Sequence, residues 1–240
     1  MTGAPPVPPP LPPPPFEPPR GGEEGGTPWE RRDRIGFVNA IVETTQQVLF
    51  RPSDFFARMP TAGGVGGPLL YGVIVGYVGL VAQALYGLVF NSMLGPGLMR
   101  FGRHGEFARL APFLHSGMTF AGQLVLGPIG IVIGLFVAAG LLHVFLMLLG
   151  GANRDFETTF RVVSYSHAVS LLNLVPLCGG LIGAVWWIVV AATGLTAAHQ
   201  TSQGKAIAAV LLPILIVCCC CGLVAFMVFG GIASVLGHLR

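Results

Sequence analysis

The chain has 240 residues, of which 53% are hydrophobic and only 10% are charged, and its mean hydropathy is +0.74. Soluble domains carry about 25% charged residues, so this composition excludes an ordinary soluble domain and indicates a polytopic membrane protein. The net charge of +3 is small, and no long basic run with interleaved aromatic residues occurs. Nucleic acid is therefore excluded as an expected partner.

The N-terminal segment Met1–Pro28 is dominated by proline, with glycine and acidic residues toward its end. It has too few apolar side chains to fold, so the sequence predicts a disordered proline-rich tail that samples polyproline II. The spacing P-x-x-P recurs in this tail. Both a solvated spacer and a ligand for a proline-recognising domain remain open.

Residues 29–60 predict an amphipathic cytosolic or interfacial helix. Apolar residues recur at helical spacing between Ile35 and Leu49, with polar residues on the other faces. Pro52 ends this helix, and a short turn with two phenylalanines follows. Such a helix just before a membrane span either lies in the bilayer interface or packs against the protein's own helices.

The remaining residues, 61–240, contain long stretches without Lys, Arg, Asp or Glu. A bilayer core about 30 Å thick needs roughly 20 apolar residues for one crossing, so each stretch can cross at least once. Proline and glycine divide them further. The sequence then predicts an all-α bundle with five spans, at Leu69–Met93, Ile129–Leu149, Val162–Val175, Leu181–Ala198 and Ile207–Phe229.

The dipeptide Gly127–Pro128 is expected to break the second charge-free stretch. The segment before it, Phe107–Leu126, carries several polar residues and is interpreted as an interfacial or re-entrant helix rather than a sixth span. Two pairs of glycines at i, i+4 spacing, Gly72/Gly76 and Gly130/Gly134, predict close helix contacts.

Positive charge favours a cytosolic N-terminus. In this orientation most of the 13 Lys and Arg residues lie inside, and the outer side holds only Arg100, Arg103, Arg109 and Arg240.

The densest polar motif is the run 150–161, which joins the second and third expected spans. It is either a structural re-entry turn or a surface that contacts partner proteins or lipid headgroups. The candidate contact residues are Arg154, Asp155, Phe156, Phe160 and Arg161.

A second polar group lies inside the expected spans two and three. Polar side chains within membrane helices either bridge neighbouring helices or line a path for a solute or a proton. The members of this expected cluster are His143, Tyr165, His167, Ser170 and Asn173.

No catalytic or metal-binding set is expected. Asp155 and Glu157 are two residues apart and point to different helix faces, and no serine stands in a G-x-S-x-G turn. The five cysteines, Cys178 and the run Cys218–Cys221, lack zinc-site spacing and are interpreted as small apolar residues of the membrane region. We therefore expect neither an enzyme nor a cofactor.

Several ordered motifs resemble a known family. They read "VLFRPSDFFARMP", "GGANRDFETTFRVVSYS", "LLNLVPLCGGLIGAVWWIVVAATGL" and "AHQTSQGKAIAAVLLP". Together they resemble the YIP domain (Ypt/Rab-interacting protein) in its bacterial form, over roughly Trp29–Phe229. The resemblance implies a five-span integral membrane protein with a cytosolic N-terminus, in the bacterial plasma membrane.

The resemblance also bears on partners. Eukaryotic members bind Rab GTPases, but their acidic "DLYGP" element has no match here, and "FRPSDFF" stands in its place; this puts Rab binding in doubt. The expected function is a non-enzymatic scaffold or adaptor in membrane organisation or trafficking. It would contact the lipid bilayer and other membrane proteins or a second copy of itself. The alternative is a small-solute or proton transporter or channel.

Overall fold

The computed structural model describes residues 26–98 and 106–238 and contains helices but no strands in this part of the chain, which confirms the all-α prediction. The elements in chain order are η1 (Pro28–Arg31), α1 (Arg32–Ile35), α2 (Phe37–Phe50), α3 (Pro52–Arg58), α4 (Gly66–Leu98), α5 (Glu106–Leu148), α6 (Phe156–Ser166), η3 (His167–Leu174), α7 (Gly179–His199) and α8 (Gln203–His238).

Four helices of the described chain are long and apolar enough to cross a membrane. They contain the expected first, second, fourth and fifth spans wholly or in large part, and their candidate segments are Gly66–Phe90, Gly117–Leu148, Gly179–His199 and Gln203–Val224.

The expected third span, Val162–Val175, is not among these candidates. Its residues belong to two shorter elements, because α6 ends at Ser166 and continues as the 3-10 helix η3. All residues from Thr158 to Ser166 are buried inside the protein. Ser164, Tyr165 and Ser166 are buried against other helices, whereas Leu174 and Val175 at the end of the segment are exposed.

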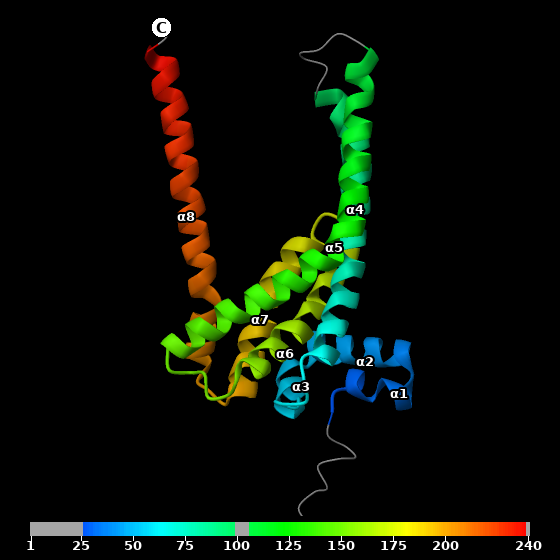
Figure 1. The fold of residues 1–240 in the computed structure, drawn as a ribbon, viewed down its shortest axis with the longest axis vertical. Helices are drawn as coiled ribbons and strands as arrows, with labels where there is room; N and C mark the ends of the chain where they lie inside the picture. The colour runs from blue at the N-terminus through cyan, green and yellow to red at the C-terminus, as the bar shows by residue number, and fades with distance from the viewer. Residues whose placement is uncertain (1–25, 99–105, 239–240) are drawn as a thin grey trace, which may run out of the picture.

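The expected break at Gly127–Pro128 is wrong, since α5 continues through both residues. Phe107–Leu126 is therefore the first half of a long helix and not a separate interfacial segment. A proline in a helix removes one backbone hydrogen bond and bends the helix, but need not end it. Figure 1 shows α5 running beside α4 and then turning toward the start of α8.

Residues 26–59, which we call the head, form η1, α1, α2 and α3 at one end of the bundle (Figure 1). Pro52 is the first residue of α3, which confirms the predicted end of the preceding helix. Gly36 separates α1 from α2 with a φ of 89°, a conformation that side chains other than glycine rarely adopt. Thr27 and Pro28, at the expected end of the tail, are buried in the head.

Glycines allow α4 to approach the central elements α6 and η3. A Cβ on Gly79 would lie 2.3 Å from the Ser170 carbonyl oxygen, and one on Gly76 would lie 2.6 Å from the His167 ring. The expected close contact at Gly72/Gly76 is thus confirmed. Gly130 and Gly134 have no described atom near their Cβ positions, so the second expected pair makes no such contact with the described residues.

Candidate functional site

Arg161 joins the head to the membrane domain. Its side chain is 1% exposed and forms an ion pair with Glu30 of the head. A second ion pair, at 3.9 Å, joins it to Glu157 one turn earlier on α6. Its Nη1 also donates a 3.0 Å hydrogen bond to the Gly64 carbonyl oxygen. A buried arginine needs such partners, because an unpaired buried charge is very costly.

The loop between the head and α4 is fixed by the same turn of α6. The Glu157 carboxylate accepts a 2.7 Å hydrogen bond from the Gly64 amide. The Thr158 hydroxyl donates at 3.0 Å to the carbonyl oxygen of Thr61. Three residues of α6 therefore determine how the head is placed on the bundle.

Aromatic side chains continue this interface into the core. The Trp29 ring nitrogen donates a 2.7 Å hydrogen bond to the Gly67 carbonyl at the start of α4. Tyr165 hydrogen-bonds the Thr27 hydroxyl at 2.9 Å, and its ring lies 5.4 Å from the ring of Tyr71. All four of the side chains Thr27, Trp29, Tyr71 and Tyr165 are almost completely buried.

A separate series of hydrogen-bonded side chains, the His143–Thr159–His199 chain, connects α5 through α6 to α7. His143 Nδ1 lies 2.8 Å from the Thr159 hydroxyl, and the same hydroxyl lies 2.9 Å from His199 Nε2. His199 is fully buried, and its Nδ1 has no partner among the described residues. The three side chains can relay a proton, because the Thr159 hydroxyl can accept a hydrogen bond from one histidine and donate one to the other.

The expected cluster in spans two and three is not one site. His143 belongs to the chain just described, while Tyr165 contacts the head. His167 packs beside Gly76 of α4, and the Ser170 hydroxyl donates at 2.9 Å to the Val75 carbonyl oxygen. Asn173 lies near the start of α7, where its side-chain oxygen would be 3.5 Å from a Cβ on Gly180.

The expected contact surface in 154–161 is also divided. Arg154 and Asp155 are exposed, and Phe156 is half-buried. Phe160 and Arg161 are fully buried and contact the protein's own interior. Their helix position explains this, since α6 contacts α4, α5 and α7.

Thr27, Glu30, Thr159 and His199 were not singled out from the sequence as members of these networks. A signal for the first two exists: Thr27-x-x-Glu30 forms a capping box at the start of η1. For Thr159 and His199 no local pattern is available, because they meet only when α6 packs on α7.

No group of His, Cys, Asp or Glu in the described residues could hold a metal ion.

The Yip1 domain family model matches residues 47–235. The chain belongs to the Yip1 domain family. It is therefore a multi-pass integral membrane protein of a family that is generally non-enzymatic. No curated protein and no solved structure matched the chain. The match begins at Gln47, so the Glu30 partner of Arg161 lies before the matched region, whereas Arg161 lies within it.

Proposed function

We propose that this Yip1 domain protein is a non-enzymatic scaffold or adaptor in membrane organisation or trafficking, and that its head acts on the lipid at the inner surface of the bilayer. One observation carries the proposal. The head is fixed to the bundle by buried polar contacts, yet α2 exposes apolar side chains, with Val38 69% and Val42 48% exposed.

The faces of α2 support an interfacial position. Ala40, Thr44 and Val48 face the protein core. Val38 and Val42 form an exposed apolar ridge on the side of the helix away from that face, and the exposed polar residue Asn39 lies about 100° around the helix from Val38. A helix with core, apolar and polar sectors in this order fits the boundary between the bundle, lipid and water.

We further propose five crossings, with α6 and η3 together as the third. Their 11 and 8 residues span about 32 Å at the usual rises of the two helix types, close to the roughly 30 Å of a bilayer core. Lys205 donates at 2.8 Å to the Gly150 carbonyl, and Asn153 donates at 3.1 Å to the His199 carbonyl. Both contacts join the loop before α6 to the segment after α7, which supports a crossing by α6 and η3 and a return by α7.

The charge distribution favours a cytosolic position for this side and for the head. The resemblance to the bacterial form of the family supports the bacterial plasma membrane as its location. Five crossings then place the native Cys178 outside the cell, whereas four crossings without α6 and η3 place it inside.

The crossing number is tested with a variant in which only Cys178 remains, the cysteines of α8 being replaced by alanine. A membrane-impermeant maleimide added to intact cells should label Cys178. Labelling only after the cells are opened would contradict the five-span topology.

The scaffold proposal is tested by reconstituting the full chain in vesicles and labelling position 38 or position 39 with an environment-sensitive fluorophore. We expect lipid-borne quenchers to act on position 38 and aqueous quenchers on position 39. The variant Val38→Glu/Val42→Glu should keep its fold but lose the effect of the protein on vesicle shape. An unchanged effect would contradict the proposal.

The His143–Thr159–His199 chain favours the second candidate, a proton or small-solute path. However, His167 and Asn173 lie elsewhere and do not continue the chain across the bundle. Proton flux into vesicles measures this directly. Flux that is lost in Thr159→Val, with folding intact, would favour the transporter over the scaffold.

A further inference from the structure

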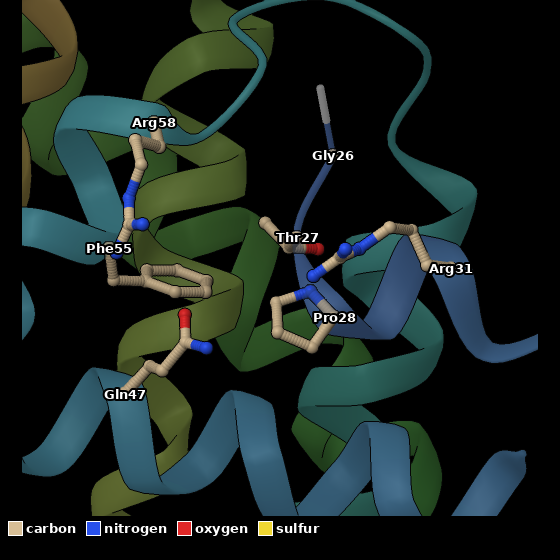
Figure 2. Close-up of a pocket in the computed structure, with 7 residues that line it drawn as sticks. All are labelled: Gly26, Thr27, Pro28, Arg31, Gln47, Phe55 and Arg58. Carbon is tan, nitrogen blue, oxygen red and sulfur yellow. The ribbon is translucent and has the colours of Figure 1, made fainter. Parts of the chain in front are cut away.

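A cavity of about 480 Å³ lies between the beginning of the head, α2 and α3. This volume falls within the range of small-ligand sites. The described residues that line the cavity include two arginines and no acidic residue: Gly26, Thr27, Pro28, Arg31, Gln47, Phe55 and Arg58 (Figure 2).

Arg31 has an unfulfilled hydrogen-bonding group at this cavity. Its Nε is buried and has no partner among the described residues. A buried polar group without a hydrogen-bond partner destabilises the folded state by about 1–3 kcal/mol. A ligand that accepts a hydrogen bond from this Nε would remove that cost. Figure 2 shows the guanidinium of Arg31 extending toward Thr27 and Pro28.

Arg58 lies across the cavity from Arg31, on the same side as Phe55, and Gln47 lies below them in the view (Figure 2). The Arg58 Nε donates a 3.0 Å hydrogen bond to the Asp54 carbonyl oxygen, which orients the guanidinium and leaves its two terminal amino groups for another acceptor. Arg58 is exposed at the surface, so a ligand can reach it from outside the head.

The local charge favours an anion. Within the described residues neither Arg31 nor Arg58 forms an ion pair with a carboxylate. Two carboxylates of the described residues contact lining residues, and both already have partners. Glu30 accepts a 3.0 Å hydrogen bond from the Thr27 amide and pairs with Arg161, and Glu43 accepts a 3.1 Å hydrogen bond from the Gln47 amide. Two guanidinium groups with free donors match the oxygen atoms of a phosphate, which accept charge-assisted hydrogen bonds.

We propose that this cavity binds a phosphate group, carried either by the headgroup of an anionic lipid or by a soluble phosphate. Both sources can reach it. The head adjoins the start of α4 through the bond from Trp29 to Gly67, at the end of a candidate span, and the cavity itself opens to the surface beside Arg58. The site is a property of the head alone and does not depend on α2 entering the bilayer.

Two measurements on the full chain separate the sources. In detergent, inorganic phosphate is titrated at constant ionic strength while thermal unfolding is followed. In nanodiscs of phosphatidylcholine with a minor fraction of phosphatidylglycerol, native mass spectrometry counts the anionic lipids that stay bound. Arg31→Gln and Arg58→Gln remove one cation each, and Arg51→Gln is the matched control, because Arg51 is exposed on the same head but does not line the cavity.

We expect each cavity variant to weaken binding about tenfold, the effect of losing one charge-assisted hydrogen bond, and Arg51→Gln to leave it unchanged. Loss in the nanodisc measurement alone identifies the lipid, and loss in the titration alone identifies soluble phosphate. Absence of binding by the wild type in both measurements would overturn the proposal, as would equal weakening by Arg51→Gln. If Arg31→Gln does not fold, the exposed Arg58→Gln still decides the question.

Discussion

The end of the bundle around α6 and the C-terminal helix α8 differ in how their side chains are used. Around α6, hydrogen bonds and ion pairs from Glu157, Thr158, Thr159 and Arg161 connect the head, the loop before α4 and two neighbouring helices. In α8, Ala206, Ala209 and Val210 are buried. The residues from Ile214 through Val224 are all exposed. Polar contacts therefore fix the positions of the elements around α6. The exposed part of α8 makes no comparable contacts with the described residues, and its main feature is a long hydrophobic surface.

The sharpest test of this comparison is Arg161→Leu. The substitution removes the Arg161 donor from the partly exposed Glu30 carboxylate and from the Gly64 carbonyl, so we expect a loss of about 3 kcal/mol in the free energy of unfolding. Denaturant unfolding in detergent measures it. Arg154→Leu is the control, because Arg154 is exposed in the same region; a similar loss there would show that the network is not the cause.

Gly79→Ala tests the close approach of α4 to η3. Its new methyl group would meet the Ser170 carbonyl oxygen at 2.3 Å, and we expect a loss of about 1–3 kcal/mol from overpacking. Gly134→Ala, on the open face of α5, should instead be neutral or stabilising, because alanine favours helices. Thermal unfolding of the two variants checks both signs, and equal shifts would refute the contact.

Thr159→Val tests the chain between the two histidines. It keeps the shape of the side chain but removes the hydroxyl that joins His143 to His199, and we expect a loss of about 1–2 kcal/mol. The matched control is Thr44→Val, because Thr44 is equally buried but its hydroxyl has no partner among the described residues. Thermal unfolding should therefore distinguish the two variants, and identical losses would argue against the hydrogen bonds.

The smallest effect is expected at α8. Cys219→Ala should change the free energy of unfolding by less than about 0.5 kcal/mol, since Cys219 is exposed on the helix and touches no core. Val210→Ala in the packed part of the same helix should cost about 1–3 kcal/mol by leaving a cavity. Chemical unfolding compares them. A large loss at Cys219 would reveal packing against a second copy or another protein.

Helix positions and helix ends that depend on local sequence pattern could be predicted from the sequence. Hydropathy together with the positions of proline and glycine predicted the four helices that the structure identifies as candidate spans, and Pro52 predicted the end of α2. The predicted helix break at Gly127–Pro128 was wrong, because a proline inside a long membrane helix can bend the helix without ending it. The segment from Val162 to Val175 was predicted as one continuous span, but it is divided between α6 and the 3-10 helix η3 and is not among the candidate membrane helices.

The site could be predicted less well, for a physical reason. His143 and Arg161 were recognised as unusual, but their partners are determined by tertiary packing. Glu30 is 131 positions from Arg161 along the chain, and His199 is 40 positions from Thr159. No helical period connects residues so far apart. The exposed Arg154 and the buried Arg161 also look alike in the sequence, since a single charged island contains both.

The contact between Glu30 and Arg161 also sets an order of events during synthesis. The head leaves the ribosome first, but the arginine that holds it is made 131 residues later. At about 5–20 residues per second, translation leaves the head without this partner for roughly 7–26 s. During that interval Trp29 and the apolar side of α2 lack their final neighbours, so a chaperone or the membrane surface has time to bind the nascent head before α6 is synthesised.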